Sequence, residues 1–196
     1  MPYTAQIDLL VQTQLCDRLR HLTLFSSHLL FVSGDKGAGK STVLTNYVES
    51  DFNRYAFKID AEKEFGEVAI RTSILQQISF DGRFNAQQSL ANGVAQLRQQ
   101  LSHDITVCID NAQHLSGAFV AELIQLVELS RANELSININ VMLFASSDWV
   151  DKALAKCSDT KTYILELEVE QLDPQAAMQF VQTQFKQANY DPQFAN

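Results

Sequence analysis

Nine residues, from Gly34 to Thr42, constrain the fold of this chain more than any other feature. They read Gly-Asp-Lys-Gly-Ala-Gly-Lys-Ser-Thr, which is the full pattern G-x-x-x-x-G-K-[ST] of a phosphate-binding loop. Glycines let such a loop curl until successive N–H groups converge on phosphate oxygens, and the following helix adds its positive N-terminal end. We therefore predict that the chain binds a nucleoside triphosphate. The residues predicted to hold it are Gly34, Asp35, Lys36, Gly37, Ala38, Gly39, Lys40, Ser41 and Thr42.

The sequence on either side of this loop supports the prediction. Residues 29–32 form a continuous apolar run, typical of a strand buried on both faces, and apolar residues recur at helical spacing over 43–48. Strand, glycine loop and helix thus follow in the order that phosphate binding needs. Lys40 is expected to reach the terminal phosphates, and Ser41 to ligate Mg²⁺. The alternative interpretation of the loop is an ordinary glycine-rich turn.

Length and composition indicate one globular domain. The 196 residues leave room for a small appendage, and 46% of them are hydrophobic, as is normal for a packed core. The net charge of −8 and the lack of a basic run argue against a nucleic-acid partner. No stretch approaches the ~20 apolar residues that span a bilayer, and the N-terminus has no signal-peptide pattern. We expect a cytoplasmic domain.

Hydrophobic periodicity predicts strands that alternate with helices. Expected strands cover residues 29–32, 55–60, 105–109, 137–144 and 163–167, and expected helices cover residues 5–22, 43–48, 70–78, 90–101, 120–127 and 148–156. Such alternation indicates an α/β fold with three layers and a mainly parallel, five-stranded sheet. We assign residues 1–170 to this core and residues 171–196 to the beginning of a small helical lid.

The C-terminal part of the chain leads us to expect a fragment of a longer protein. Asp173 and Pro174 open the last predicted helix of the lid. Asp191 and Pro192 have the pattern of another helix start, which runs out at Asn196.

A second nucleotide motif is predicted at the end of the third strand. The β-branched run 105–109 ends at Asp110, and ligands of an open parallel sheet bind at the carboxyl edge of its strands. The carboxylate of Asp110 is therefore expected to meet the Mg²⁺ held near Ser41. A helix cap without a metal role is the alternative interpretation of Asp110.

These motifs resemble those of the AAA+ ATPases. Residues 34–42 resemble a Walker A motif, and residues 107–110 resemble a Walker B motif. The runs 21–27 and 109–113 are similar to those of the bacterial ExeA/GspA-like and DamX-related proteins. The AAA+ resemblance implies a P-loop NTPase core, bound ATP or ADP with Mg²⁺, and a protein partner or homo-oligomer. The DamX-related resemblance implies a role in cell division or the cell envelope, with a membrane anchor downstream.

Three departures from the AAA+ pattern predict slow or impaired hydrolysis. The glutamate that follows the Walker B aspartate in that family is here Asn111, which can orient water but cannot take its proton. The contribution of a general base, about 10² to 10⁴-fold, should therefore be reduced. No arginine follows Arg131, although the family places an arginine finger there, worth ~10³ to 10⁵-fold. A sensor-2 arginine, which the family carries on a later lid helix, is either missing or lies beyond Asn196.

Asn111 and Ser146 are the candidate catalytic residues. Ser146 follows the fourth predicted strand, where the resemblance places a sensor-1 residue near the γ-phosphate. A local turn hydrogen bond is the alternative role for Ser146. The sequence thus favours an ATP-binding switch that controls assembly or partner binding. A nucleotide-independent scaffold with a degenerate ATPase fold and a P-loop small-molecule kinase are the alternatives.

Overall fold

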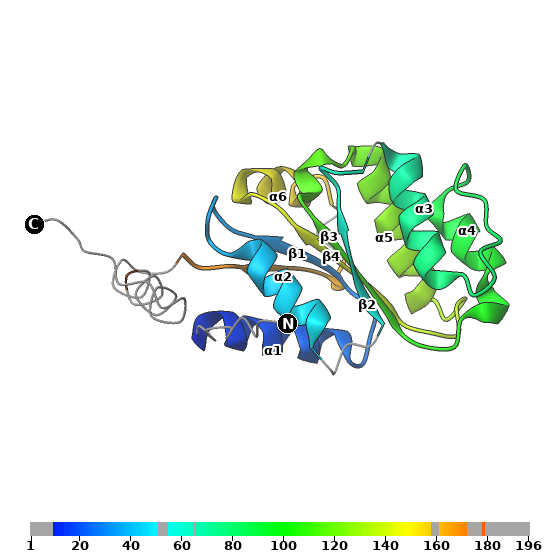
Figure 1. Ribbon diagram of the computed structural model, residues 1–196, viewed down its shortest axis with the longest axis horizontal. Coiled ribbons are helices and arrows are strands. Elements are labelled where there is room, and N and C mark those ends of the chain that lie inside the picture. Colours follow the sequence, from blue (N-terminus) through cyan, green and yellow to red (C-terminus); the bar gives the residue numbers. More distant parts are fainter. Residues whose placement is uncertain (1–9, 51–54, 65, 158–160, 172–177, 179–196) are drawn as a thin grey trace, which may run out of the picture.

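Five parallel strands form the centre of the protein. The computed structural model describes residues 10–50, 55–64, 66–157, 161–171 and 178 (Figure 1). The strands are β1 (Leu29–Ser33), β2 (Ala56–Asp60), β3 (Ile105–Asp110), β4 (Ile139–Phe144) and β5 (Ile164–Glu168). They lie in the order β2-β3-β4-β1-β5, and every neighbouring pair is parallel. The α/β fold with a five-stranded, mainly parallel sheet is thereby confirmed.

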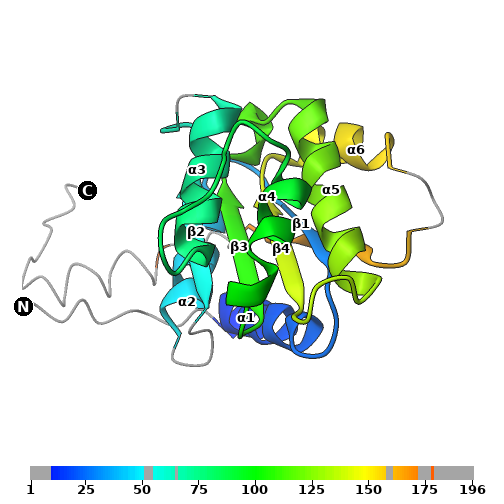
Figure 2. The same ribbon diagram turned by 90° about the vertical axis from the view of Figure 1, so that its right-hand side faces the viewer.

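Helices cover both faces of this sheet. They are α1 (Leu10–Thr23), α2 (Lys40–Glu49), α3 (Glu67–Ile78), α4 (Leu90–Gln96), α5 (Gly117–Arg131) and α6 (Ser147–Leu154), with 3-10 turns at Arg98–Gln100 and Ala112–His114. Figure 1 shows α1 and α2 on one side of the sheet, and Figure 2 shows α3, α4 and α5 together on the other. None of the helices in the described ranges is both long and apolar enough to cross a membrane.

Alternate residues of each central strand belong to different halves of the core. In β1, Leu30 and Val32 pack with α1 and α2, whereas Leu29 and Phe31 pack with the helices of the opposite face. All five residues of β1 are buried. The continuous apolar run that predicted this strand follows from burial on both faces.

Helix α4 is shorter than the sequence predicts. The helix expected over residues 90–101 was too long, because α4 ends at Gln96 and the chain continues as a 3-10 turn. Asn92 and Gly93 lie inside α4, and both are weak helix formers. The lid predicted over residues 171–196, with the last predicted helix from residue 173, lies outside the described residues apart from residues 171 and 178, and residues 5–9 of the first predicted helix also lie outside them.

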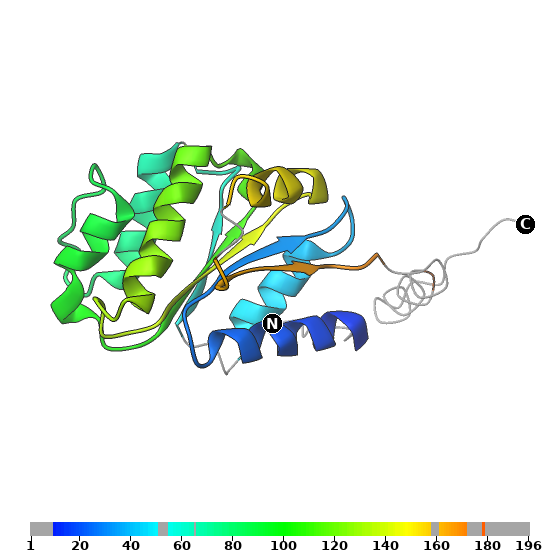
Figure 3. The ribbon, with the colours of Figure 1, turned by 180° about the vertical axis from the view of Figure 1, so that it is seen from behind.

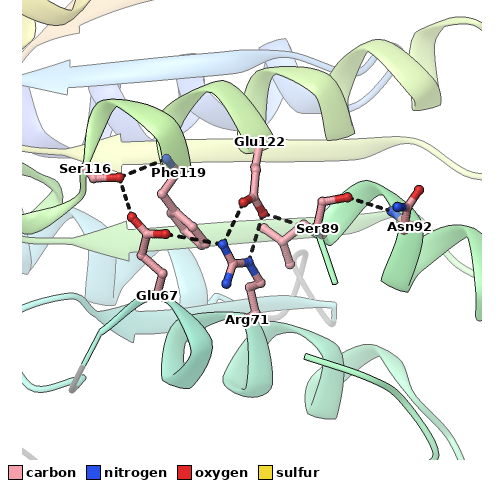
Figure 4. A network of polar contacts seen from close by, with 8 residues as sticks. Glu67, Arg71, Ser89, Asn92, Ser116, Phe119 and Glu122 are labelled. Atoms are coloured by element: carbon pink, nitrogen blue, oxygen red, sulfur yellow. Dashed lines mark hydrogen bonds and ion pairs between the residues drawn. The ribbon is translucent and has the colours of Figure 1, made fainter. Parts of the chain in front are cut away.

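A polar network ties α3, α4 and α5 together (Figure 4). Arg71 donates from Nε and Nη2 to the two carboxylate oxygens of Glu122, at 2.9 and 2.6 Å. It also contacts Glu67, whose carboxylate accepts a hydrogen bond from the Ser116 hydroxyl. Glu122 in turn accepts the backbone N–H of Leu90 at the start of α4, at 3.1 Å. One bidentate ion pair therefore positions three helices on this face of the sheet.

The strand register brings the ends of β1 and β3 to one level. Leu143 of β4 pairs with Phe31 on one side and with Ile109 on the other. The loop after β1 and the residues after β3 consequently lie at the same carboxyl edge, with the end of β4 between them. Figure 3 shows this edge from behind, with β5 beside β1.

Candidate functional site

The glycine-rich loop joins β1 to α2 at the carboxyl edge of the sheet. It occupies residues 34–39, between the end of β1 at Ser33 and the start of α2 at Lys40. Gly37 and Gly39 have φ angles of 88° and 94°. This left-handed region costs other residues about 1–2 kcal/mol. The curled backbone leaves the positive N-terminal end of α2 facing the loop, which is the arrangement that anions favour.

Helix α1 supports the loop from behind, through Gln12. The side chain of Gln12 is buried, and a Cβ added at Gly39 would lie only 2.4 Å from its Nε2 atom. The φ angle of 94° therefore favours glycine at position 39, and a larger residue there would also have to displace the end of the Gln12 side chain. Gln12 was not predicted from the sequence, where it is one of several glutamines on an amphipathic helix.

The chain that leaves β5 closes the loop on its other side. A Cβ at Gly34 would lie 3.0 Å from the carbonyl oxygen of Val169. The Nε2 atom of Gln171 donates to Oδ2 of Asp35 at 3.0 Å. The loop thus touches the segment that leads away from the sheet.

Lys40 is the first residue of α2, and its side chain folds back over the loop. Its ammonium donates to the backbone carbonyls of Gly34 at 2.7 Å and Asp35 at 2.9 Å. Partial burial lowers the pKa of Lys40, and the charges of Asp110 and Asp35 only partly oppose this effect. The carboxylate of Asp110 is thus one of the charges that act on the Lys40 ammonium.

The remaining loop residues offer their side chains to solvent. Ser41 and Thr42 lie exposed in the first turn of α2, and Asp35 and Lys36 lie exposed in the loop, whereas Ala38 is buried in the core. The hydroxyl of Ser41 is therefore accessible at the same edge as Lys40.

Asp110 is buried at the end of β3, with 4% of its surface exposed. Its Oδ1 accepts the backbone N–H of Asn111 at 3.1 Å, and its Oδ2 lies 2.9 Å from Nζ of Lys58. Ser116, not Asp110, caps the following helix α5, by accepting the N–H of Phe119. The alternative role of Asp110 as the cap of that helix is therefore not adopted.

Lys58 is a member of the site that the sequence did not reveal. It lies in β2 opposite Cys108, so its side chain is on the same face of the sheet as that of Asp110. Residue 58 is the polar member of an alternating strand, which by itself indicates only a solvent-facing lysine. Its importance follows from the neighbour of β2 and from the register of that pair.

Asn111 and Asp60 form a second polar pair at this edge. The Nδ2 atom of Asn111 donates to Oδ1 of Asp60 at 2.9 Å. Partial burial raises the pKa of Asp60, but hydrogen bonds from Asn111 and Lys63 outweigh it and hold this pKa below its ordinary value. Asp60 is therefore an ionised acceptor at neutral pH.

Ser146 is placed between the two motifs. It is exposed directly after β4, and it precedes α6 without making a side-chain capping bond to that helix. The predicted candidates thus lie at one edge of the sheet: Lys40 and Ser41 in the first turn of α2, Asp110 at the end of β3, Asn111 directly after it, and Ser146 before α6. Arg131, in contrast, donates to the Ser27 carbonyl before β1, at the opposite edge.

The residues present fit a magnesium ion that is held together with a nucleotide. A serine hydroxyl and an aspartate carboxylate are hard oxygen ligands, and Mg²⁺ usually completes its shell with phosphates and water. Within the described ranges, no group of three His, Cys, Asp or Glu side chains could hold a metal by itself. Ser41 and Asp110 would therefore hold Mg²⁺ only in company with phosphate oxygens.

A cavity lies away from these residues, at the other edge of the sheet. A cavity of about 580 Å³ opens near the amino edge of the sheet, where Arg20, His21, Tyr55 and His103 are among its lining residues. None of the described residues that line it belongs to the phosphate loop or to the end of β3. We place the candidate site at the carboxyl edge, because the phosphate-loop geometry and the charged pairs occur there.

Comparisons with known proteins agree with this architecture. The model of the family described as "AAA domain" matches residues 23–154. No curated protein matches the chain in sequence.

Solved structures of ORC and Cdc6 proteins share the fold. The ORC2 protein of Aeropyrum pernix, solved as ADPNP-ADP complexes, is 15% identical with a TM-score of 0.70, over 95% of this chain and 54% of that chain. Cdc6p of Pyrobaculum aerophilum is 18% identical with a TM-score of 0.67, over 95% and 52%. The Aeropyrum pernix ORC1 protein in complex with DNA is 12% identical with a TM-score of 0.63, over 94% and 50%. The chain thus spans about half the length of these proteins.

Proposed function

Because the chain belongs to the AAA domain family, we propose that it binds ATP with Mg²⁺ and uses the bound nucleotide as a switch for assembly or partner binding. One observation carries the proposal: the Lys40 ammonium lies against the carbonyls of a curled phosphate loop, at the same edge of the sheet as the buried carboxylate of Asp110. A positive group, a helix N-terminus and a buried carboxylate at one edge are what a Mg-nucleotide needs.

Each group has a distinct role in this proposal. Backbone N–H groups of the loop and the N-terminus of α2 hold the phosphates, and Lys40 exchanges two loop carbonyls for phosphate oxygens. Ser41 and Asp110 hold Mg²⁺, which neutralises phosphate charge when bound. ATP and ADP are both expected ligands.

Slow hydrolysis follows from Asn111 and from the position of Arg131. Asn111 cannot take a proton from water, and Arg131, the last arginine, is engaged at the opposite edge of the sheet. A bound triphosphate therefore persists, which suits a switch better than a motor.

The contacts of the loop support a path from nucleotide to partner. Gly34 packs on Val169, and Asp35 accepts a hydrogen bond from Gln171. A change of the loop on phosphate binding would thus move the segment that leads toward residues 171–196. We propose that these residues begin a helical lid on the core of residues 1–170.

The partner is proposed to be a protein or a second copy of this chain. The Aeropyrum pernix ORC1 protein was solved in complex with DNA. The net charge of −8 and the lack of a basic run disfavour the same ligand here. A role in bacterial cell division or at the cell envelope, with an anchor beyond this chain, rests on the DamX-related resemblance.

Calorimetry with ATP, ADP and Mg²⁺ tests the proposal. Lys40→Ala should weaken ATP binding by at least about tenfold, since it removes a charge-assisted contact to phosphate. Lys152→Ala, which removes an exposed lysine of α6, should leave ATP affinity unchanged. Equal affinities of Lys40→Ala and wild type would contradict nucleotide binding at this loop. Equal partner affinity with and without ATP would favour a scaffold, and transfer of a labelled γ-phosphate to a metabolite would favour a kinase.

A further inference from the structure

A carboxylate at the end of β2 reaches into the candidate site from a neighbouring strand. Asp60 is the last residue of β2, and the parallel register places it directly opposite Asp110. Asn111, which follows Asp110, donates from Nδ2 to Oδ1 of Asp60 at 2.9 Å. Asp60 thus touches the residue that replaces the usual catalytic glutamate.

This contact determines which way the Asn111 amide points. An ionised carboxylate only accepts hydrogen bonds, so Asn111 must turn its NH₂ group toward Asp60. The opposite orientation would set two acceptor oxygens against each other. The amide oxygen of Asn111 is therefore directed away from Asp60, where Nε2 of Gln113 lies 3.4 Å from it. That distance is long for a hydrogen bond, and a better donor can replace Gln113.

The backbone of Asn111 suits this arrangement. Its φ and ψ angles are 55° and 38°, in the left-handed region, which asparagine tolerates better than most residues. Asp60 is held in turn, because its Oδ1 also accepts the N–H of Glu62 at 3.2 Å and its Oδ2 lies 2.9 Å from Nζ of Lys63. The carboxylate is thereby fixed on both oxygens.

From this geometry we infer that Asp60 is a positioning residue, which fixes the Asn111 amide so that its oxygen accepts a hydrogen bond from the attacking water. This inference rests on the proposed function, and it supplies the source of a residual hydrolysis. Asp60 touches neither water nor phosphate in this scheme and acts only through Asn111.

The chemical step balances without a base on the protein. The water oxygen bonds to the terminal phosphorus, and the bond from that phosphorus to the bridging oxygen breaks, so that ADP leaves with its electron pair. The proton that Asn111 orients passes to an oxygen of the transferred phosphate, because an amide cannot keep it. The products are ADP and inorganic phosphate, which retains the water oxygen.

Steady-state release of phosphate, measured beside calorimetry of Mg-ATP, tests the role of Asp60. Asp60→Ala should lower kcat about tenfold, the effect of one lost orienting hydrogen bond, and should leave the Kd of Mg-ATP within about twofold. Asp60→Asn keeps an acceptor oxygen for Asn111 and should retain kcat within about threefold. Glu134→Ala removes an exposed acidic residue of the loop after α5 and serves as the matched control.

A double variant separates positioning from independent effects. Asp60→Ala should cost nothing further in an Asn111→Ala background, since both changes remove the same oriented oxygen. Additive losses in the double variant, or an unchanged kcat in Asp60→Ala, would overturn the inference. If Asp60→Ala does not fold, the same kcat measurements can be made on Asp60→Leu, because leucine is close in size to aspartate and accepts no hydrogen bond.

Failure of this inference can be told apart from failure of the proposed function. Wild-type protein that binds Mg-ATP but releases no phosphate would overturn the role of Asp60 and leave the nucleotide switch standing. Wild-type protein that binds no Mg-ATP would overturn both.

Discussion

The ammonium of Lys58 lies 2.9 Å from Oδ2 of Asp110, the carboxylate proposed to hold Mg²⁺. The two residues come from adjacent strands and share one face of the sheet. Only 5% of the Asp110 side chain is exposed, so water screens this pair poorly. A magnesium ion at Asp110 must therefore compete with a cation that the protein itself supplies.

Removing the Lys58 ammonium should strengthen the binding of Mg²⁺ at Asp110. In Lys58→Met the buried carboxylate of Asp110 loses its partner, which should cost about 1–3 kcal/mol of folding stability. Mg-ATP should restore more stability to Lys58→Met than to wild type, and half-saturation should need several-fold less Mg²⁺. Titration of ATP binding against Mg²⁺, with Lys152→Met as control, measures this shift. An unchanged or higher magnesium requirement would show that Lys58 does not compete.

The candidate site divides into residues that local pattern predicts and residues that only the register reveals. The loop 34–42 is contiguous, and Asp110 ends an apolar strand, so both follow from short stretches of sequence. Lys58 and Asp60 belong to the site because β2 lies next to β3 in the sheet. The alternation of apolar and polar residues along a strand shows which residues share a face, but it does not show which strand lies beside it. The role of Gln12 is harder still to predict, because its contact with the loop depends on how α1 packs behind that loop.

The fold shows the same division. Strand, loop and helix around residues 29–48 followed from periodicity and one motif, and the structure confirms them. The helix expected to reach residue 101 ends at Gln96. The prediction was too long because Leu97 and Leu101, on either side of the 3-10 turn Arg98–Gln100, still pack inward and so continue the apolar spacing of the helix. Periodicity reports which side is buried, and it does not report hydrogen-bond geometry.

A matched pair of glycine variants isolates the contact between Gly39 and Gln12. Gly37→Ala meets only the cost of a left-handed alanine, about 1–2 kcal/mol, since nothing lies within 4 Å of a Cβ there. Gly39→Ala meets that cost and must also displace the side-chain amide of Gln12, so its loss of unfolding free energy should exceed that of Gly37→Ala by the cost of this displacement. Adding Gln12→Ala to Gly39→Ala should bring the loss back toward that of Gly37→Ala. Equal losses in the two single variants, by urea denaturation, would mean that Gln12 moves aside freely.

The network on the opposite face predicts a pH dependence of stability. A side-chain hydrogen bond from Arg71 outweighs partial burial and holds the pKa of Glu122 below its ordinary value of 4.5. A depressed carboxyl pKa stabilises the fold above the unfolded value, and this contribution is lost as the pH falls through the folded value. Glu122→Gln should therefore cost about 1–3 kcal/mol at pH 7 and progressively less below pH 4.5. Urea denaturation from pH 7 to 3, with the exposed Glu134→Gln as control, measures this difference, and a cost independent of pH would contradict it.

The last prediction concerns a glutamate restored after Asp110. Asn111→Glu supplies a group that can take the proton of water, which by itself would raise the basal turnover. The structure adds a condition, because the new carboxylate would face the carboxylate of Asp60, with which Asn111 now forms a hydrogen bond. Repulsion between like charges should turn the glutamate away, so the single variant should gain little. Asp60→Asn in the same chain replaces repulsion with a donor, and this double variant should exceed both wild type and Asn111→Glu in kcat. A double variant no faster than Asn111→Glu would contradict repulsion between Asp60 and the new glutamate.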